Sequence, residues 1–194
     1  MAKTTIATGG LSDSAVTSAK ITDATIATAD IADDAVTKAK VTGLNTPAFK
    51  VLLDSAQTIA DETNTVIAYD TEIYDTDSAV SSGVFTVPAG KGGKYAFYVN
   101  GGQSHGSDVS DVNFWLSKNN QTAISVVNGE SIGIEYHHDG TETPNYIQQL
   151  AGCFDLAATD TVRVYHWHNY GGNRDTAIRG RMTFSGYRIA EWII

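Results

Sequence analysis

The fold is decided by residues 83–100, "GVFTVPAGKGGKYAFYVN", in which two strand-like segments flank a cluster of turn-forming residues. "GVFTVP" and "KYAFYVN" are rich in β-branched and aromatic side chains, which favour β-strands. "PAGKGG" between them contains a proline and three glycines, which favour turns and interrupt strands. The stretch therefore predicts two strands separated by a tight turn.

The same pattern extends through residues 47–194. Segments rich in β-branched and aromatic residues alternate with short segments rich in Gly, Asn, Asp and Ser. Further strands are expected at residues 48–53, 65–70, 112–117, 123–127, 146–156, 161–168 and 181–192. No stretch shows an amphipathic helical period of useful length, and many short strands that close on themselves form a sandwich. We therefore predict an all-β fold, a sandwich or jelly roll, for this part of the chain.

Eight short motifs make this prediction more specific. They are "PAF" (47–49), "VIAYD" (66–70), "YD" (74–75), "GVFTVPAG" (83–90), "GKYAFYV" (93–99), "FWLSKNN" (114–120), "LAATDTVRV" (156–164) and "FSGYRI" (184–189). Their order and spacing resemble the jelly roll of the complement globular-head and tumour-necrosis-factor superfamily over residues 47–190. The resemblance implies a homotrimer, in which three jelly rolls pack around an axis above a stalk. The Gly-x-y stalk of the vertebrate form is absent, and a different repeat takes its place.

That repeat has an aliphatic residue at every fifth position. The row comprises Ile6, Leu11, Val16, Ile21, Ile26, Ile31, Val36 and Val41. Side chains five residues apart do not line up on one side of an α-helix or of a flat strand. The segment therefore needs a bend in each repeat or partners on more than one side. This sparse apolar content does not offset the backbone entropy of ordering about 40 residues. We therefore expect the segment to be disordered in a lone chain and ordered against identical copies or another protein.

Three interpretations of the repeat follow: a flexible Thr/Ala-rich linker, a four-sided solenoid and a thin stalk of several chains. The strict register argues against a linker, and a solenoid that uses about twenty residues per turn would form only two turns. The repeat is similar to repeats in structural proteins of tailed bacteriophages. We expect an anchor to the particle at residues 1–10, a repeat stalk at residues 11–46 and a jelly-roll knob at residues 47–194.

Composition limits the classes of partner. The chain has 13 basic and 22 acidic residues, for a net charge of −9, which argues against a general nucleic-acid binder. The single cysteine, Cys153, cannot form an internal disulfide, and its place in the apolar segment "LAGCFDL" is typical of a structural thiol. "MAKTTIATGG" lacks the apolar core of a signal peptide, and no run reaches membrane-spanning length, so neither export nor membrane insertion is expected.

Two stretches contain candidate binding residues. In "YHWHNY" (165–170), His166 and His168 would point to the same side of a strand and could ligate a metal ion. Some trimeric phage fibres resemble this in using His-x-His from three chains to hold one axial ion. The alternative is a solvent-facing strand. The loops around "EYHHDG" and "NYGGNRD" offer Tyr136, His137, His138, Tyr170 and Asn173 for contact with a receptor, because exposed aromatic rings stack on sugars.

Two further features point away from a metal loop and from catalysis. The acidic run at residues 70–77 lacks the spacing of a calcium loop and favours a solvated turn. No nucleophile elbow or zinc-protease motif occurs, and we expect no enzymatic activity and no organic cofactor.

These observations favour a structural protein on the virion surface, assembled in the cytoplasm of the host. In the main hypothesis it is a homotrimeric tail or head fibre whose knob attaches to a host glycan or outer-membrane component, while its N-terminal arm binds capsid or tail proteins. One alternative is a capsid decoration or cement protein that stabilises the shell. Another is a bacterial surface adhesin of the same fold, against which the expected absence of a signal peptide argues.

Overall fold

The computed structural model describes residues 9–12, 14–36, 40, 46–104, 111–122, 131–137, 145–176 and 182–191. The chain divides into two compact units, Met1–Thr42 and Gly43–Ile194. We call the first unit the arm and the second the knob. The division falls four residues before the end of the predicted stalk.

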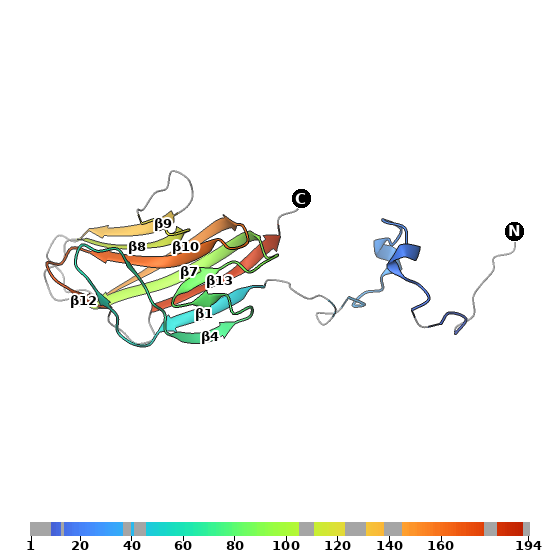
Figure 1. Ribbon diagram of the computed structural model, residues 1–194, viewed down its shortest axis with the longest axis horizontal. Helices are drawn as coiled ribbons and strands as arrows, with labels where there is room; N and C mark the ends of the chain where they lie inside the picture. The colour runs from blue at the N-terminus through green and yellow to red at the C-terminus, as the bar shows by residue number, and fades with distance from the viewer. Residues whose placement is uncertain are drawn as a thin grey trace. The chain divides into compact units, whose positions relative to one another are not determined.

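The knob consists of two antiparallel sheets and a small two-stranded sheet (Figure 1). The five-stranded sheet has the order β10 (Asn145–Leu156), β7 (Gly93–Ser104), β13 (Met182–Glu191), β1 (Ala48–Leu53), β4 (Thr71–Asp75). The six-stranded sheet has the order β5 (Val80–Ser81), β6 (Val84–Thr86), β11 (Thr161–His168), β8 (Asp111–Lys118), β9 (Ser131–His137), and β3 (Thr65–Val66) pairs with β11. The small sheet pairs β12 (Arg174–Asp175) with β2 (Thr58–Ile59). The predicted all-β fold is confirmed.

The strand order shows how the chain closes on itself. β13, the last strand, lies between β1 and β7 and pairs with both in antiparallel orientation. The first and last strands of the knob are therefore neighbours in the five-stranded sheet. Strands between them in the sequence form the second sheet (Figure 1). Such non-consecutive neighbours are typical of a jelly roll.

The core contains the phenylalanines of the recognised motifs. Phe49, Phe85, Phe97 and Phe184 come from β1, β6, β7 and β13, and each is 0% exposed. The ring of Phe49 lies 5.0 Å from that of Phe85, 4.8 Å from that of Phe184 and 6.2 Å from that of Phe97, measured between centroids. Aromatic rings at these separations contribute to stability beyond the area they bury. Motifs far apart in the sequence thus supply one aromatic cluster between the sheets.

Gly186 in the "FSG" motif is explained by this cluster. It faces Phe49 across the β1–β13 pair and Phe97 across the β7–β13 pair. A Cβ atom at Gly186 would lie 2.5 Å from Cδ1 of Phe97 and 3.0 Å from Cε1 of Phe49. Any side chain at this position would displace a buried ring, so the two phenylalanines require glycine here.

The structure differs from the expected strands in three places. Residues 71–75, expected as a solvated acidic turn, form β4 at the edge of the five-stranded sheet. Residues 131–137, part of which was expected as a loop, form β9. The strand expected at residues 123–127 lies outside the described residues.

The arm has regular local structure, and none of its described side chains is buried. Its described helical elements are two 3₁₀ turns, η1 (Ser18–Lys20) and η2 (Thr28–Asp30), neither of which contains a buried residue. Across the described residues, no helix is long and apolar enough to span a membrane.

Candidate functional sites

The arm exposes its whole described row of aliphatic side chains. Leu11, Val16, Ile21, Ile26, Ile31 and Val36 are each between 42% and 59% exposed. Ile6 and Val41 lie outside the described residues. The constant spacing of these exposed aliphatic side chains makes the row a candidate surface for contact with a partner.

Each pentad contains the bend that a single seam requires. From residue 11 to residue 35, the amide of the fifth residue donates to the carbonyl of the second residue in all five pentads, with N···O distances of 2.9 to 3.1 Å. The first of these bonds joins Ala15 to Ser12, and the last joins Ala35 to Ala32. The aliphatic residue that opens each pentad lies outside this hydrogen bond, and the amides of Ile21 and Ile31 also donate to the carbonyls of Ser18 and Thr28 in the preceding pentad.

The turns alternate between two forms, so the structural unit is ten residues long. Ser14, Ala24 and Asp34 have φ angles of +63°, +62° and +62°, in the left-handed region, whereas the intervening pentads contain η1 and η2. The sequence carries this signal in Asp13, Asp23 and Asp33, which occupy the third position of alternate pentads only. The five-residue aliphatic period does not reveal it.

The outer side of the five-stranded sheet carries a second exposed apolar surface. Tyr98 on β7 and Tyr187 and Ile189 on β13 are 48%, 38% and 48% exposed. The rings of Tyr98 and Tyr187 stack, with centroids 6.3 Å apart and an interplanar angle of 19°. A hydrogen bond between their side chains is the largest cause of the raised pKa of Tyr98. These residues, with Ala151 and Cys153, form what we call the tyrosine face.

Small side chains border the stacked tyrosines. Ala151 on β10 pairs with Tyr98, and Ala48 on β1 pairs with Tyr187. Cys153 also faces outward and is exposed, so the prediction of a buried structural thiol is wrong. The reason is strand parity: Phe154 and Leu156 on β10 are buried, which places Cys153 and Asp155 on the outer side. The result is an apolar patch around Tyr98, Tyr187 and Ile189 on the outer side of the sheet.

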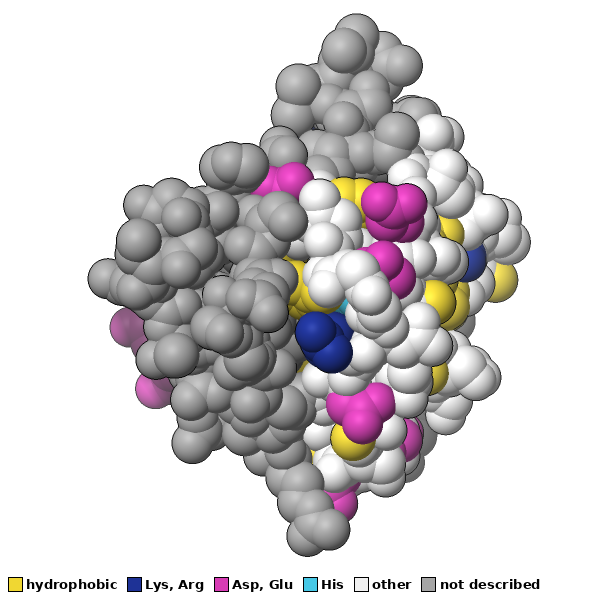
Figure 2. Space-filling view, turned by 90° about the vertical axis from the view of Figure 1, so that its left-hand side faces the viewer, with side chains coloured by type: hydrophobic (Ala, Val, Ile, Leu, Met, Phe, Trp, Pro, Cys, Tyr) yellow, Lys and Arg dark blue, Asp and Glu magenta, His cyan; other side chains and the backbone are white. Residues whose placement is uncertain are grey.

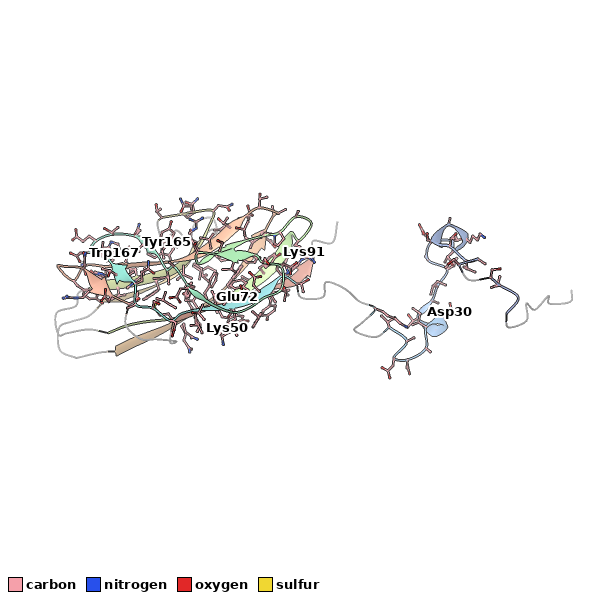
Figure 3. The ribbon with its side chains drawn as sticks, turned by 60° about the horizontal axis from the view of Figure 1, so that its bottom comes forward. Asp30, Lys50, Glu72, Lys91, Tyr165 and Trp167 are labelled. Atoms are coloured by element: carbon pink, nitrogen blue, oxygen red, sulfur yellow. The ribbon has the colours of Figure 1, made fainter. Side chains whose placement is uncertain are left out.

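His166 and His168 face the interior of the sandwich. Both are 0% exposed, on the same side of β11 as Val162 and Val164, so the alternative of a solvent-facing strand is wrong. The imidazole of His166 stacks on Phe114 at 4.2 Å between centroids. The opposite side of β11 holds Tyr165 and Trp167, both labelled in Figure 3.

The environment of His168 is that of a packed histidine. Its Nε2 lies 3.1 Å from the carbonyl oxygen of Ile59, and its Nδ1 lies 3.3 Å from Oδ1 of Asp61. Burial lowers the pKa of His168 and outweighs the opposing effects of the Ile59 carbonyl and Asp61. No group of three or more His, Cys, Asp or Glu side chains that could hold a metal occurs within the described part of the chain. An axial ion bound by His166 and His168 stays a prediction, and it would require both rings to leave the core.

The candidate receptor loops are placed as follows. Tyr170 lies in the expected loop, but it is 7% exposed and stacks on His168 at 4.5 Å, so the expectation of a projecting ring is wrong for this residue. Asn173 is exposed, and its Oδ1 accepts the amide of Asp61 at 3.4 Å. Tyr136 and His137 belong to β9 rather than to a loop, and only their backbone is described. His138 lies outside the described residues.

The end of the knob that carries β12 is polar (Figure 2). Among the residues that the structure describes there, hydrophobic side chains are scattered, and acidic side chains outnumber basic ones (Figure 2). The guanidinium of Arg174 lies 5.9 Å from the ring centroid of Tyr170. The described part of this end therefore shows no continuous apolar surface (Figure 2).

Asp70 and Asp75 anchor backbone turns. Asp70 accepts the amides of Asp54 and Ser55 at 2.7 and 2.9 Å, and these bonds lower its pKa to about 2. Asp75 accepts the amide of Val80 at 2.7 Å. Their carboxylates serve the fold as acceptors for backbone amides.

Comparisons with known proteins identify the fold. The globular domain of a zebrafish complement 1qA protein matches with a TM-score of 0.53 and 14% identity, covering 75% of this chain and 99% of that chain. The fold is this jelly roll. Murine APRIL at pH 8.0 matches with a TM-score of 0.52 and 11% identity, over 73% of this chain and 98% of that chain. Eiger TNF from S. frugiperda matches with a TM-score of 0.51 and 14% identity, over 74% and 92%. No protein-family model and no curated protein matches the chain.

Proposed function

We propose that the chain is a non-enzymatic structural protein of a bacteriophage particle, a homotrimeric fibre or spike whose knob attaches to the host. The observation that carries the proposal is the row of exposed aliphatic side chains in the arm, joined in one chain to a jelly-roll knob. A lone chain leaves this row in water, whereas a slender fibre of identical chains buries it.

Self-association of the knob is supported by the tyrosine face. At the exposures of Tyr98 and Tyr187, burial of each ring removes on the order of 80–100 Å² from water, or about 2 kcal/mol per ring. Charged side chains lie at the borders of the face: Lys50 on β1 is on the side nearest the edge strand β4, which carries Glu72 (Figure 3), and Lys94 on β7 pairs with Asp155 on β10. Three copies that meet through this face around an axis would cover the stacked rings of each protomer.

Attachment to the host is assigned to the end of the knob that carries β12. Its exposed polar side chains, including Asn173 and Arg174, are suited to hydrogen bonds with a sugar or a lipopolysaccharide-like surface component. The arm, with its N-terminal ten residues, would bind a capsid or tail protein, which places the protein on the virion surface. No bound cofactor is required for this role.

The test is binding of the fluorescently labelled full chain to cells of the bacterium that the phage infects. We expect saturable binding, competed by the unlabelled chain and weakened in the Asn173→Ala/Arg174→Ala variant. The matched control is Thr86→Ala, an exposed residue on β6 in the six-stranded sheet, which should bind as the unchanged chain does. Equal, non-saturable association of all three proteins with cells would contradict the attachment role.

A decoration or cement protein is the second candidate, because the same arm could bind shell subunits without any receptor. Particles that lack the protein would then lose infectivity on heating at a lower temperature while adsorbing normally. Imaging the particle with labelled chain separates the two, since a fibre tip and an even coat over the shell give different patterns.

A further inference from the structure

Two shallow hollows lie along the aliphatic row of the arm. The first is lined by Ile21 and Ile26 together with small and polar residues, among them Asp23. The second is lined by the aliphatic residues Ile26, Ile31 and Val36 and also by small and polar residues, among them Asp33 and Asp34. Because Ile26 contributes to both hollows, the aliphatic side chains form one continuous row, which we call the apolar track, with depressions between them. Side chains of a second protein surface could pack into such depressions, as side chains interdigitate in a protein interior.

The polar groups of the arm find partners within the arm. Nζ of Lys20 donates to the carbonyl of Ala15 at 2.8 Å, and Nζ of Lys40 donates to the carbonyl of Ala35 at 2.9 Å. In the unit between them, Oδ2 of Asp30 accepts the amide of Ala27 at 2.9 Å. Lys20, Asp30 and Lys40, the last residues of successive ten-residue units, therefore stabilise the turns of the arm. The apolar track remains available to bind a partner.

The spacing of the track identifies that partner. The aliphatic residues recur every five residues, but the two turn forms recur every ten, as the φ angles of Ser14, Ala24 and Asp34 show. A regular helix or strand has no ten-residue repeat of its own, whereas another copy of the arm repeats both the aliphatic period and the alternation of turns. Another copy of the same arm stays in step along its full length.

We propose that the ten-residue unit is the assembly module of the arm: identical arms pack in parallel and in register, and aliphatic side chains of one copy fill the hollows of the next. Turns of one form then lie level with turns of the same form in every copy. The inference rests on the proposed self-association and adds the register and the module length to it.

Two deletions in the full chain test the module. Removal of residues 16–25 deletes one unit and two aliphatic residues but leaves the two turn forms in alternation. Removal of residues 21–25 deletes only one aliphatic residue but places two turns of the η form next to each other. Each deletion is co-expressed with the tagged full chain, so that in mixed assemblies the arms are offset by ten or by five residues on the N-terminal side of the deletion. We expect limited proteolysis to cleave the arms of mixed assemblies with the five-residue deletion roughly tenfold faster than those with the ten-residue deletion. Only an offset of ten residues places turns of the same form level, and cleavage follows local opening.

Point variants provide a second measurement that does not alter the length of the arm. Ile26→Asn places an amide between the two hollows, whereas Ala29→Asn places it at an exposed position that lines neither hollow. Faster cleavage of the arm is expected for Ile26→Asn alone.

The outcomes separate the module from self-association itself. If the assembly forms and the arm is protected, but mixed assemblies with the ten-residue deletion are cleaved faster than those with the five-residue deletion, the module is wrong and self-association stands. If the unchanged chain is monomeric with a rapidly cleaved arm, self-association itself is wrong. Equal cleavage of Ile26→Asn and Ala29→Asn would also overturn the packing of the track against another copy.

Discussion

Substitution of Gly186 by alanine tests the aromatic cluster that joins the two sheets. The added Cβ would lie 2.5 and 2.8 Å from two atoms of the Phe97 ring, where carbon atoms normally approach to about 3.5–4.0 Å. The ring must therefore shift by about 1 Å, and it is enclosed by Phe49, Phe85 and Phe184, all 0% exposed. Overpacking of this kind costs about 1–3 kcal/mol, and the lower backbone entropy of alanine returns about 0.5–1 kcal/mol. We expect a net loss of about 1 kcal/mol.

The assay is thermal unfolding followed by circular dichroism at one protein concentration, because self-association would make the midpoint concentration-dependent. For a unit of this size, 1 kcal/mol corresponds to a decrease in midpoint of about 2–4 °C. Gly172→Ala is the matched control, since no atom lies within 4 Å of its added Cβ. In a Phe97→Leu background the effect of Gly186→Ala should shrink, because the two positions are in contact. Equal midpoints for Gly186→Ala and Gly172→Ala would refute the packing described here.

Three further substitutions test single groups in the knob. The hydroxyl of Tyr69 is buried without a hydrogen-bond partner among the described residues, so Tyr69→Phe should raise the free energy of unfolding by about 1 kcal/mol in urea titration, and a decrease would contradict this assignment. The pKa of Asp70 is lowered from 3.8 to about 2 by backbone amides, so the stability it contributes is present above pH 3.8 and disappears as the pH falls toward 2. Asp70→Asn should therefore flatten the acid-unfolding curve in that window, and an unchanged slope would count against the hydrogen bonds to Asp54 and Ser55. Burial lowers the pKa of His168 below its ordinary 6.5, so the unfolded chain binds the proton more readily and stability declines as the pH falls below 6.5. His168→Gln should remove this part of the decline, which urea midpoints at pH 7 and pH 5 can measure; the same decline in the variant would assign it to another group.

The core was predictable because its residues lie in short sequence motifs with strong β propensity, and these segments are strands in the folded protein. Phe49, Phe85, Phe97 and Phe184 each belong to a short motif in a strand with clear β propensity, and these motifs meet in the structure. Gly186 was recognisable in the same way, as part of a motif. No single motif predicts which sheet a strand joins. The order of the motifs along the chain predicts this, and with it the jelly roll.

The orientation of side chains on strands with two apolar faces was harder to predict. On β11, Val162 and Val164 indicate that His166 and His168 point inward, whereas Tyr165 and Trp167 indicate the reverse. The structure resolves the conflict through a contact that the sequence does not show. The hydroxyl of Tyr165 donates to Oδ1 of Asn120 in the segment that follows β8, so this segment covers part of the outer side of β11.

The tyrosine face and the ten-residue unit were missed for different reasons. Tyr98 and Tyr187 become neighbours only when β13 enters the sheet beside β7, which requires the topology. The unit was visible in Asp13, Asp23 and Asp33, but the stronger five-residue aliphatic period concealed it. The alternation of the two turn forms along the backbone shows that two pentads form one unit, and composition alone does not determine this alternation.

The claim on which the assembly depends is that one chain cannot cover its own aliphatic row. Multi-angle light scattering of the full-length protein, combined with protease mapping of residues 11–36, measures this directly. We predict a particle of about 62 kDa, three times the 20.7 kDa of one chain, with the arm protected. A particle with the mass of a single chain whose arm still resists protease would contradict the account.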